Sequence, residues 1–284
     1  MPVTARGRRS AAPKTSATFG GVDWAGIWRR GRRWSGSTPG RWDARARTFG
    51  RGGDGTFAPA VLRLLEPAPG WSALDVGCGT GALALPLAER IRRVTALDFS
   101  PAMLDLLRRR AAERGLRNVR PVLGAWADDW KALGLAPHDL VVASRSLLAE
   151  DLPAALRQLD AFARRRACVV APVGDGPTDR RVVEATGRAF RPGPDFLPVL
   201  GTLLSLGRFP RLEYVSSAPA RVFGSRDEAL ETLAWTVRGC TAAERGRLAR
   251  WLDRTLVPSP RGWELPGRRV VRWAVLCWDK EEEP

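Results

Sequence analysis

The sequence predicts an α/β fold in which a doubly wound, mostly parallel sheet carries helices on both faces. Three observations support this prediction. Short apolar segments alternate with amphipathic segments between residues 72 and 173, which is the pattern of parallel strands joined by crossover helices. A glycine-rich turn follows the first apolar segment. The last apolar segment alternates in polarity and comes late in the chain, which suits an antiparallel strand at the sheet edge.

Local signals support the individual elements of this core. Ser100 and Pro101 are typical of the N-cap and first turn of a helix. Pro121 weakens the third strand because proline has no backbone N–H to donate. We expect strands at 72–76, 93–97, 118–123, 139–143 and 167–173, and helices at 82–92, 101–114 and 153–165.

The flanking regions differ from this core in composition. We divide the chain into a disordered basic arm (1–20), an N-terminal helical lid (21–66), the core (67–173) and a substrate-side insertion that also completes the sheet (174–284). Helices are expected at 41–49 and 58–66, a Gly/Pro-rich segment at 174–210, a strand near 212–216, helices near 226–238 and 241–255, and the closing strand at 269–278.

The length and composition are those of an ordinary globular protein. The chain has 284 residues, of which 44% are hydrophobic, so it can form a sizeable core. No apolar run is long enough to cross a bilayer, and the N-terminus lacks the apolar stretch of a secretory signal. We therefore expect a cytoplasmic protein.

The net charge of +16 leaves the partner open. Residues 1–53 carry twelve basic residues against two acids, and such an arm can bind nucleic acid. However, all basic residues except Lys14, Lys131 and Lys280 are arginines, which a GC-rich genome would produce without any functional reason. The tryptophans at positions 24, 28, 34 and 42 could stack on nucleic-acid bases, or they could form a hydrophobic lid that packs on the domain.

The cysteines indicate neither a disulfide framework nor a metal site. Cys78, Cys168, Cys240 and Cys277 show no C-x-x-C spacing, which zinc sites and redox motifs commonly have. We therefore expect buried or incidental thiols and no metal.

The most informative segment is LDVGCGTG, residues 74–81. Closely spaced glycines between a strand and a helix let a ligand approach the backbone and the free N–H groups of the helix start. The second strand ends at Asp98, whose carboxylate can accept hydrogen bonds from both hydroxyls of a ribose. Because ligands of open α/β sheets bind at the carboxyl ends of the strands, the two strand ends predict a nucleoside site.

The spacing of the glycines fits two types of nucleoside ligand. Gly77, Gly79 and Ala82 also fit the dinucleotide pattern G-x-G-x-x-A, so a dehydrogenase is an alternative. Two features oppose it. First, the negative charge of Asp75 would repel a pyrophosphate, whereas it suits a ligand with an ammonium group and a sulfonium centre. Second, the third glycine is Gly81, which gives the spacing G-x-G-x-G and not the dinucleotide spacing.

The run from Leu74 to Met103 resembles the signature of class I S-adenosylmethionine-dependent methyltransferases, especially the small-molecule, quinone-biosynthesis-like branch. The resemblance is strong over 70–116 and extends to about 172, and the W-D-x-R-A stretch at 42–46 is similar to the helix that precedes the cofactor domain in that branch. It implies a seven-stranded sheet and S-adenosyl-L-methionine as cofactor.

The resemblance also implies roles for individual residues. Asp75 and the backbone of Gly77, Gly79 and Gly81 would hold the methionine moiety. Asp98 would bind the ribose hydroxyls, and Phe99 would pack on the adenine.

The sequence departs from the pattern after the third strand. Ala125 stands where the family often has an acid, so Asp128, backbone or water would meet the adenine amino group. Trp126 could cover the base.

For the methyl acceptor, the sequence provides only candidate binding residues, and it identifies no catalytic residue. Ser144 and Arg145 end the fourth strand beside the expected methyl position, and Arg145 could bind an acidic acceptor or form a surface salt bridge. Arg45 could reach the cofactor carboxylate from a lid. The only histidine, His138, precedes the fourth strand and is therefore expected at the opposite sheet end. An [N/D]-P-P-[Y/F] element, typical of exocyclic-amine methylation, is absent.

These observations favour a methyltransferase whose acceptor is an unidentified small molecule, bound by residues 20–56 and 174–210. An RNA- or ribosome-associated methyltransferase that uses the basic arm is the first alternative. A non-catalytic binding protein that keeps the fold is the second, and Ala125 favours it.

Overall fold

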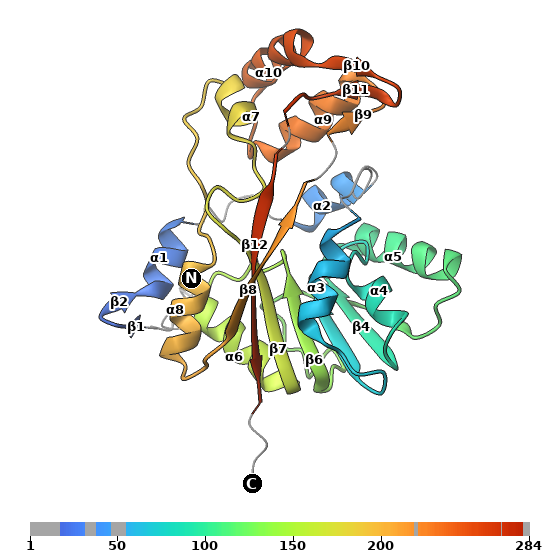
Figure 1. Cartoon of the computed structure of the whole chain (residues 1–284), viewed down its shortest axis with the longest axis vertical. Helices are drawn as coiled ribbons and strands as arrows, with labels where there is room; N and C mark the ends of the chain where they lie inside the picture. Colours follow the sequence, from blue (N-terminus) through green and yellow to red (C-terminus); the bar gives the residue numbers. More distant parts are fainter. Residues whose placement is uncertain (1–17, 32–37, 47–54, 219–220, 268, 281–284) are drawn as a thin grey trace, which may run out of the picture.

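The computed structural model describes residues 18–31, 38–46, 55–218, 221–267 and 269–280. It consists of an α/β body and a smaller cap, which lies beyond the carboxyl ends of the parallel strands (Figure 1). Most of the predicted basic arm, Trp34 and the end of the predicted 41–49 helix lie outside the described residues. Residues 18 and 19 form a short strand, which pairs with residues 22 and 23.

A seven-stranded sheet forms the centre of the body, in the order β5-β4-β3-β6-β7-β12-β8. The five strands from β5 to β7 are parallel, and β12 is antiparallel to both of its neighbours. The strands are β3 (Ser72–Val76), β4 (Arg93–Asp98), β5 (Val119–Leu123), β6 (His138–Ser144), β7 (Ala163–Pro172), β8 (Arg211–Ser217) and β12 (Val271–Asp279).

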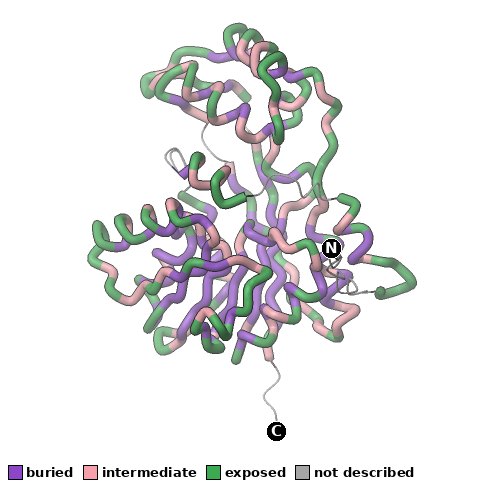
Figure 2. The backbone as a smooth tube through the Cα atoms, turned by 180° about the vertical axis from the view of Figure 1, so that it is seen from behind, coloured by how far each residue is buried: buried purple, intermediate pink, exposed green. Residues whose placement is uncertain are grey.

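Helices cover both faces of this sheet, as the sequence predicts, and the buried residues lie mainly along the strands between them (Figure 2). One face packs against α3 (Phe57–Leu65), α4 (Ala84–Ala88) and α5 (Pro101–Glu113). The other packs against α1 (Trp24–Gly31), α6 (Leu152–Phe162) and α8 (Leu197–Ser205).

Two local predictions in the core have a clear physical basis in the structure. Ser100 caps α5, because its side chain accepts a hydrogen bond from the Met103 N–H, and Pro101 follows in the first turn. Pro121 is accommodated because β5 lies at the sheet edge, where a missing N–H costs least.

The chain after β7 is more ordered than its composition suggests. The 174–210 segment contains α7 (Arg180–Ala185) and α8, and α8 buries Val199 and Leu203 against the sheet. The C-terminal strand is antiparallel as predicted, but it lies inside the sheet. The edge strand on this side of the sheet is β8, and β5 is the edge strand on the other side.

The cap is built from two separate segments of the chain. Its first segment contains α7, and its second contains β9 (Val222–Phe223), α9 (Arg226–Thr236), α10 (Ala242–Thr255), β10 (Val257–Ser259) and β11 (Gly262–Glu264). Val182 of α7 is fully buried with Leu233 and Leu248 in one small hydrophobic core. The strands β10, β11 and β9 form a separate antiparallel sheet, which the sequence pattern did not predict.

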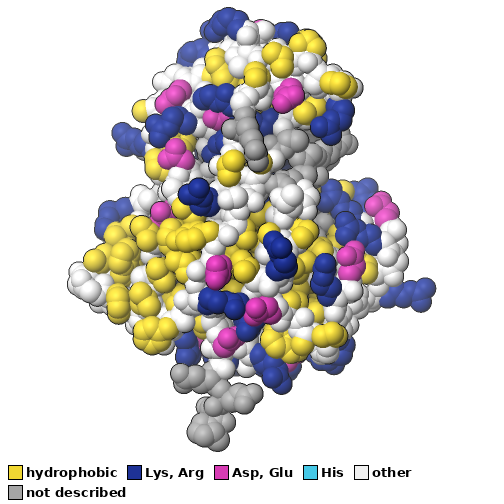
Figure 3. Space-filling model, in the orientation of Figure 1, with side chains coloured by type: hydrophobic (Ala, Val, Ile, Leu, Met, Phe, Trp, Pro, Cys, Tyr) yellow, Lys and Arg dark blue, Asp and Glu magenta, His cyan; other side chains and the backbone are white. Residues whose placement is uncertain are grey.

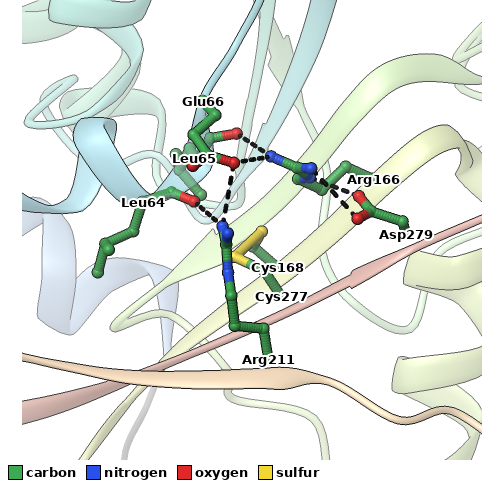
Figure 4. Close-up of a disulfide and its surroundings, with 8 residues drawn as sticks. All are labelled: Leu64, Leu65, Glu66, Arg166, Cys168, Arg211, Cys277 and Asp279. Atoms are coloured by element: carbon green, nitrogen blue, oxygen red, sulfur yellow. Dashed lines mark hydrogen bonds and ion pairs between the residues drawn. A yellow bond between two sulfur atoms is a disulfide. The ribbon is translucent and has the colours of Figure 1, made fainter.

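The expectation of unpaired thiols is wrong for two of the four cysteines. Cys168 on β7 and Cys277 on β12 form a disulfide (Figure 4). They are directly opposite in the antiparallel pair, with their Cα atoms 4.2 Å apart. The pairing could not be read from spacing, because 109 residues separate the two cysteines. Cys78 and Cys240 are free.

Beside this disulfide, two arginines anchor the carboxyl end of α3 (Figure 4). Arg166 donates to the Leu65 carbonyl and pairs with Asp279 and Glu66, while Arg211 donates to a neighbouring carbonyl of the same helix. Side-chain cations stabilise the unpaired carbonyls of a helix end. Together they fix α3 to β7, β8 and β12.

The disulfide predicts a defined thiol count. Unfolding the oxidised protein in guanidinium should expose two reactive thiols to a thiol reagent, and reduction beforehand should raise the number to four. A Cys168→Ala, Cys277→Ala variant should keep two in both conditions and lose about 2–5 kcal/mol of stability. Four reactive thiols without reduction would contradict the pairing.

Candidate active site

A cavity of about 600 Å³ lies at the carboxyl ends of β3, β4 and β6, where the sequence places the nucleoside site. This volume is within the range of sites for small molecules. Its wall includes Asp75, Gly77, Gly79, Asp98, Phe99, Ala125, Trp126, Ser144 and Arg145. Nine of the eleven candidate residues named from the sequence therefore meet at one cavity, and Gly81 and Arg45 are not on its wall.

The glycine loop turns sharply after β3 and packs on the end of β4. Gly77 and Gly79 have φ angles of +69° and +54°, in the left-handed region that favours glycine. The N–H groups of Gly77 and Cys78 both donate to the Leu97 carbonyl. A Cβ on Gly77 would lie 2.4 Å from the Ser146 Cβ, so a side chain here would displace the end of β6.

Gly81 serves packing rather than the cavity wall. Its φ angle is +86°, and a Cβ there would lie 2.4 Å from a Leu107 methyl carbon and 2.8 Å from Leu85. The third glycine of the motif thus lets the loop approach α5 and α4. This role is distinct from the ligand contact that the resemblance implies.

Asp98 connects the glycine loop to the start of α5. One carboxylate oxygen accepts from the Gly79 N–H at 2.8 Å, and the other accepts from the Ser100 N–H at 2.9 Å. Only 5% of the residue is exposed, and this burial raises the pKa of Asp98 although the N–H groups oppose the shift. Each oxygen keeps a lone pair for a further donor on the cavity side.

Asp75 is the most unusual charge in the cavity. It is 2% exposed, and its Oδ2 atom has no hydrogen-bond partner among the described residues. Burial, together with the nearby negative charge of Asp98, raises the pKa of Asp75 to about 7. A buried carboxylate oxygen without a partner is costly, so a cationic ligand group at this position would stabilise its charged form.

The part of the cavity wall that follows β5 contains some of the residues predicted to contact the adenine. Phe99, Ala125 and Trp126 line the cavity. The Trp126 indole is held because its Nε1–H donates to the Ser146 carbonyl at 2.9 Å. Asp128 is exposed and accepts from the Ala125 N–H, so it braces this turn and is not on the cavity wall.

Ser144 ends β6 and Arg145 follows it on the cavity wall. The Ser144 Oγ atom is buried without a hydrogen-bond partner among the described residues. Arg145 has a φ angle of +59°, a conformation that costs about 1–3 kcal/mol for a residue with a side chain. Its N–H donates to the Val170 carbonyl, and its guanidinium stacks 4.1 Å from the Phe57 ring centroid.

The predicted lid segment (21–66) includes α2 (Pro39–Ala46), which lies between the cap and α5 (Figure 1). Trp42 lines the cavity, and Asp43 accepts from the Ser100 hydroxyl at 2.5 Å and from the Ala102 N–H. Asp43 was not identified as functional, although it belongs to the W-D-x-R-A stretch. Phe57 was also missed, because an aromatic residue in an apolar helix gives no functional signal.

The structure places Arg45 away from the main cavity. It lines a second cavity, between α2 and the cap, and its guanidinium lies 5.2 Å from the Trp235 ring centroid. Trp235 also contacts Trp42 edge to face at 5.0 Å and accepts at its carbonyl from Arg41. These contacts attach the lid to α9 of the cap.

His138 has a structural role. It begins β6 at the sheet end opposite the cavity, as predicted, and is 3% exposed. Its ring nitrogens contact the Thr95 hydroxyl and the Ala136 carbonyl, and burial lowers the pKa of His138 to about 4. The chain has no other histidine.

Comparison with known proteins supports the class that this fold and site define. Residues 73–165 match a family model described as a methyltransferase domain. Aklanonic acid methyltransferase from Streptomyces sp. (strain C5) is 33% identical over 70% of this chain and 88% of its own length. An uncharacterized protein from Haemophilus influenzae is 27% identical over 85% of this chain and 89% of its length.

A solved structure gives the same architecture. A putative methyltransferase from Bacillus halodurans matches with a TM-score of 0.53 and 13% identity, over 80% of this chain and all of that one. The chain belongs to the class I S-adenosylmethionine-dependent methyltransferases. It is an enzyme of that class, and its acceptor is not identified by these similarities.

Burial of Asp75 predicts a pH-dependent stability. Because the folded pKa is about 7 and the unfolded value about 4, the stability that the neutral carboxyl provides is present below pH 4 and is lost as the pH rises through 7. Asparagine does not ionise, so the Asp75→Asn variant does not lose this stability as the pH rises. We expect its stabilising effect, measured by urea unfolding, to increase by about 1–3 kcal/mol from pH 5 to pH 8.

Asp105→Asn, at an exposed position on α5, is the control. Its stability relative to the unmodified protein should change less between pH 5 and pH 8 than that of Asp75→Asn. A constant effect of Asp75→Asn across this range would contradict the raised pKa.

Proposed function

We propose that this enzyme binds S-adenosyl-L-methionine in the 600 Å³ cavity and transfers its methyl group to a small molecule. The observation that carries the proposal is the position of Asp75 and Asp98 on neighbouring strand ends beside the glycine loop. The partnerless Oδ2 of Asp75 fits an ammonium group. Asp98 fits the two hydroxyls of a ribose, and Phe99 and Trp126 fit a purine face.

The cofactor would supply an electrophilic methyl group on a sulfonium. The residues of the chain would act mainly by position, because holding an acceptor in line with the methyl group accounts for much of the acceleration of such a reaction. Trp42 and the cap would limit access of water from the lid side. The Ser144 end of β6 would bound the space that the acceptor occupies.

A small-molecule acceptor is favoured by the relatives and by the surface. The aklanonic acid methyltransferase, by its name, acts on a small acid. Basic side chains are spread over the cap and the body with acids among them on the face in Figure 3, whereas nucleic-acid sites usually gather them. None of the helices in the described ranges is long and apolar enough to span a membrane. A cytoplasmic location remains a prediction.

An RNA acceptor would give a different salt dependence. Binding through phosphate contacts falls steeply with salt because counterions are released. Activity that is insensitive to salt, and unchanged after deletion of residues 1–17, supports the small-molecule assignment. A steep fall with salt would favour the RNA alternative.

Cofactor binding provides the direct test. We expect Asp98→Ala to weaken binding of S-adenosylhomocysteine by at least about tenfold in isothermal titration calorimetry, because both a ligand contact and the bond to Gly79 are lost. Asp105→Ala is the matched control and should bind normally. Unchanged affinity in a folded Asp98→Ala variant would overturn the proposed site.

The raised pKa of Asp75 predicts a linked proton release. If the ammonium group binds the ionised carboxylate, affinity for S-adenosylhomocysteine should rise up to about tenfold per pH unit below pH 7 and level off above it. Titrations in buffers of different ionisation enthalpy measure the released proton. An affinity that is flat from pH 5.5 to pH 7 would contradict this use of Asp75.

A further inference from the structure

We propose that Arg145 binds a carboxylate on the methyl acceptor, so that the acceptor is an acidic small molecule with an apolar body. This inference rests on the proposed function and specifies the class of its substrate. It follows from four features of the cavity: the scarcity of positive charge on its wall, the unused donors of Arg145, the position of this side chain along the sheet, and the neighbouring Ser144 hydroxyl.

Arg145 is the only basic side chain among the described residues that line the cavity. This is unusual in a chain with 46 lysines and arginines. The other charged groups on the wall are acidic, namely Asp75, Asp98, Glu150 and Asp151. Electrostatic recognition of an anion inside the cavity therefore depends on this one guanidinium.

The guanidinium contacts two aromatic rings, and among the described residues its N–H groups have no hydrogen-bond acceptor. It stacks 4.1 Å from the ring centroid of Phe57 and lies 5.5 Å from that of Trp273. Ring contacts occupy the faces of a guanidinium and leave its edge, which carries five N–H donors, for other partners. In the described part of the chain, no carboxylate forms an ion pair with Arg145. The edge donors match the geometry of a carboxylate.

Along the sheet, the Arg145 side chain lies on the opposite side of Asp75 from Asp98. Asp98 ends β4, Asp75 is the second-last residue of β3, and Arg145 follows β6. The Arg145 guanidinium lies near Trp273 of β12, which is further along the sheet in the same direction. The guanidinium therefore lies on the β12 side of the cavity, while its charge still acts on the buried Asp75. We assign the space on this side of the glycine loop to the acceptor.

The surroundings also suit an acid with an apolar body. The buried, partnerless Ser144 hydroxyl provides a second donor beside Arg145. Phe57, which stacks on Arg145, and Leu148 add apolar side chains to the cavity wall. An anionic group bound by Arg145 and Ser144 would orient an apolar molecule that has few other polar contacts available.

The competing role for Arg145 is to bind the carboxylate of the cofactor itself. S-adenosylhomocysteine carries that carboxylate but no acceptor, so its affinity distinguishes the two roles. We expect Arg145→Gln and Arg145→Gly to bind S-adenosylhomocysteine within about threefold of the unmodified protein. The glycine variant suits the positive φ angle and guards against misfolding, and melting temperatures are recorded for both.

The acceptor site is then probed on protein saturated with S-adenosylhomocysteine. The probes are two acids and their amides: 1-naphthoate with 1-naphthamide, and octanoate with octanamide, with affinities measured by ligand-observed NMR. We expect at least one acid to bind about tenfold or more tightly than its amide. This preference should disappear in both Arg145 variants and persist in Arg63→Gln, an exposed arginine on α3.

Each other outcome has a definite meaning. Equal binding of acids and amides, or a preference that survives in both variants, overturns the inference and leaves the proposed function intact. A loss of more than about tenfold in S-adenosylhomocysteine affinity in both variants assigns Arg145 to the cofactor and also overturns it. Failure of the unmodified protein to bind S-adenosylhomocysteine would instead refute the proposed function.

Discussion

The arrangement of the site depends on the carboxylate of Asp98. It holds the backbone of Gly79 on one side and that of Ser100 on the other, and so joins the glycine loop to the first turn of α5. Ser100 in turn donates to Asp43 of the lid helix. One continuous set of hydrogen bonds thus runs from the loop to the lid, and a ligand that contacts Asp98 would affect both.

A second constraint is the unequal distribution of charge. The cavity buries two carboxylates on adjacent strands, and burial raises the pKa of both. The charge of Asp98 raises the pKa of Asp75 further, and the charge of Asp43 raises that of Asp98. Such an arrangement destabilises the fold and is retained where it serves binding. Arg145 moderates it only in part, since its charge lowers the pKa of Asp75 less than burial raises it.

The core was predictable because its signals are local. The glycine loop, Asp98 and the Ser100 cap each lie within a few residues of the element they determine, and the strand alternation gave the parallel sheet. The unpredicted features depend on contacts between distant residues. Cys168 meets Cys277 only because β7 pairs with β12, α8 lies in a segment that composition marks as loop, and Arg45 reaches the cap because Trp235 extends to α2. Phe57 lines the cavity because α3 lies beside it, and α3 is held there in part by Arg166 and Arg211, which come from distant strands.

The division of the cap between two chain segments affects how it can be made and exchanged. Its small core joins Val182, which precedes α8, to Leu248, which follows β8, so it cannot close until the chain has been synthesised beyond Leu248. For the same reason, transplanting the cap onto a relative would require two coordinated grafts around an intact β8. A different cap therefore cannot be acquired by exchange of a single continuous cassette, because both segments have to change together.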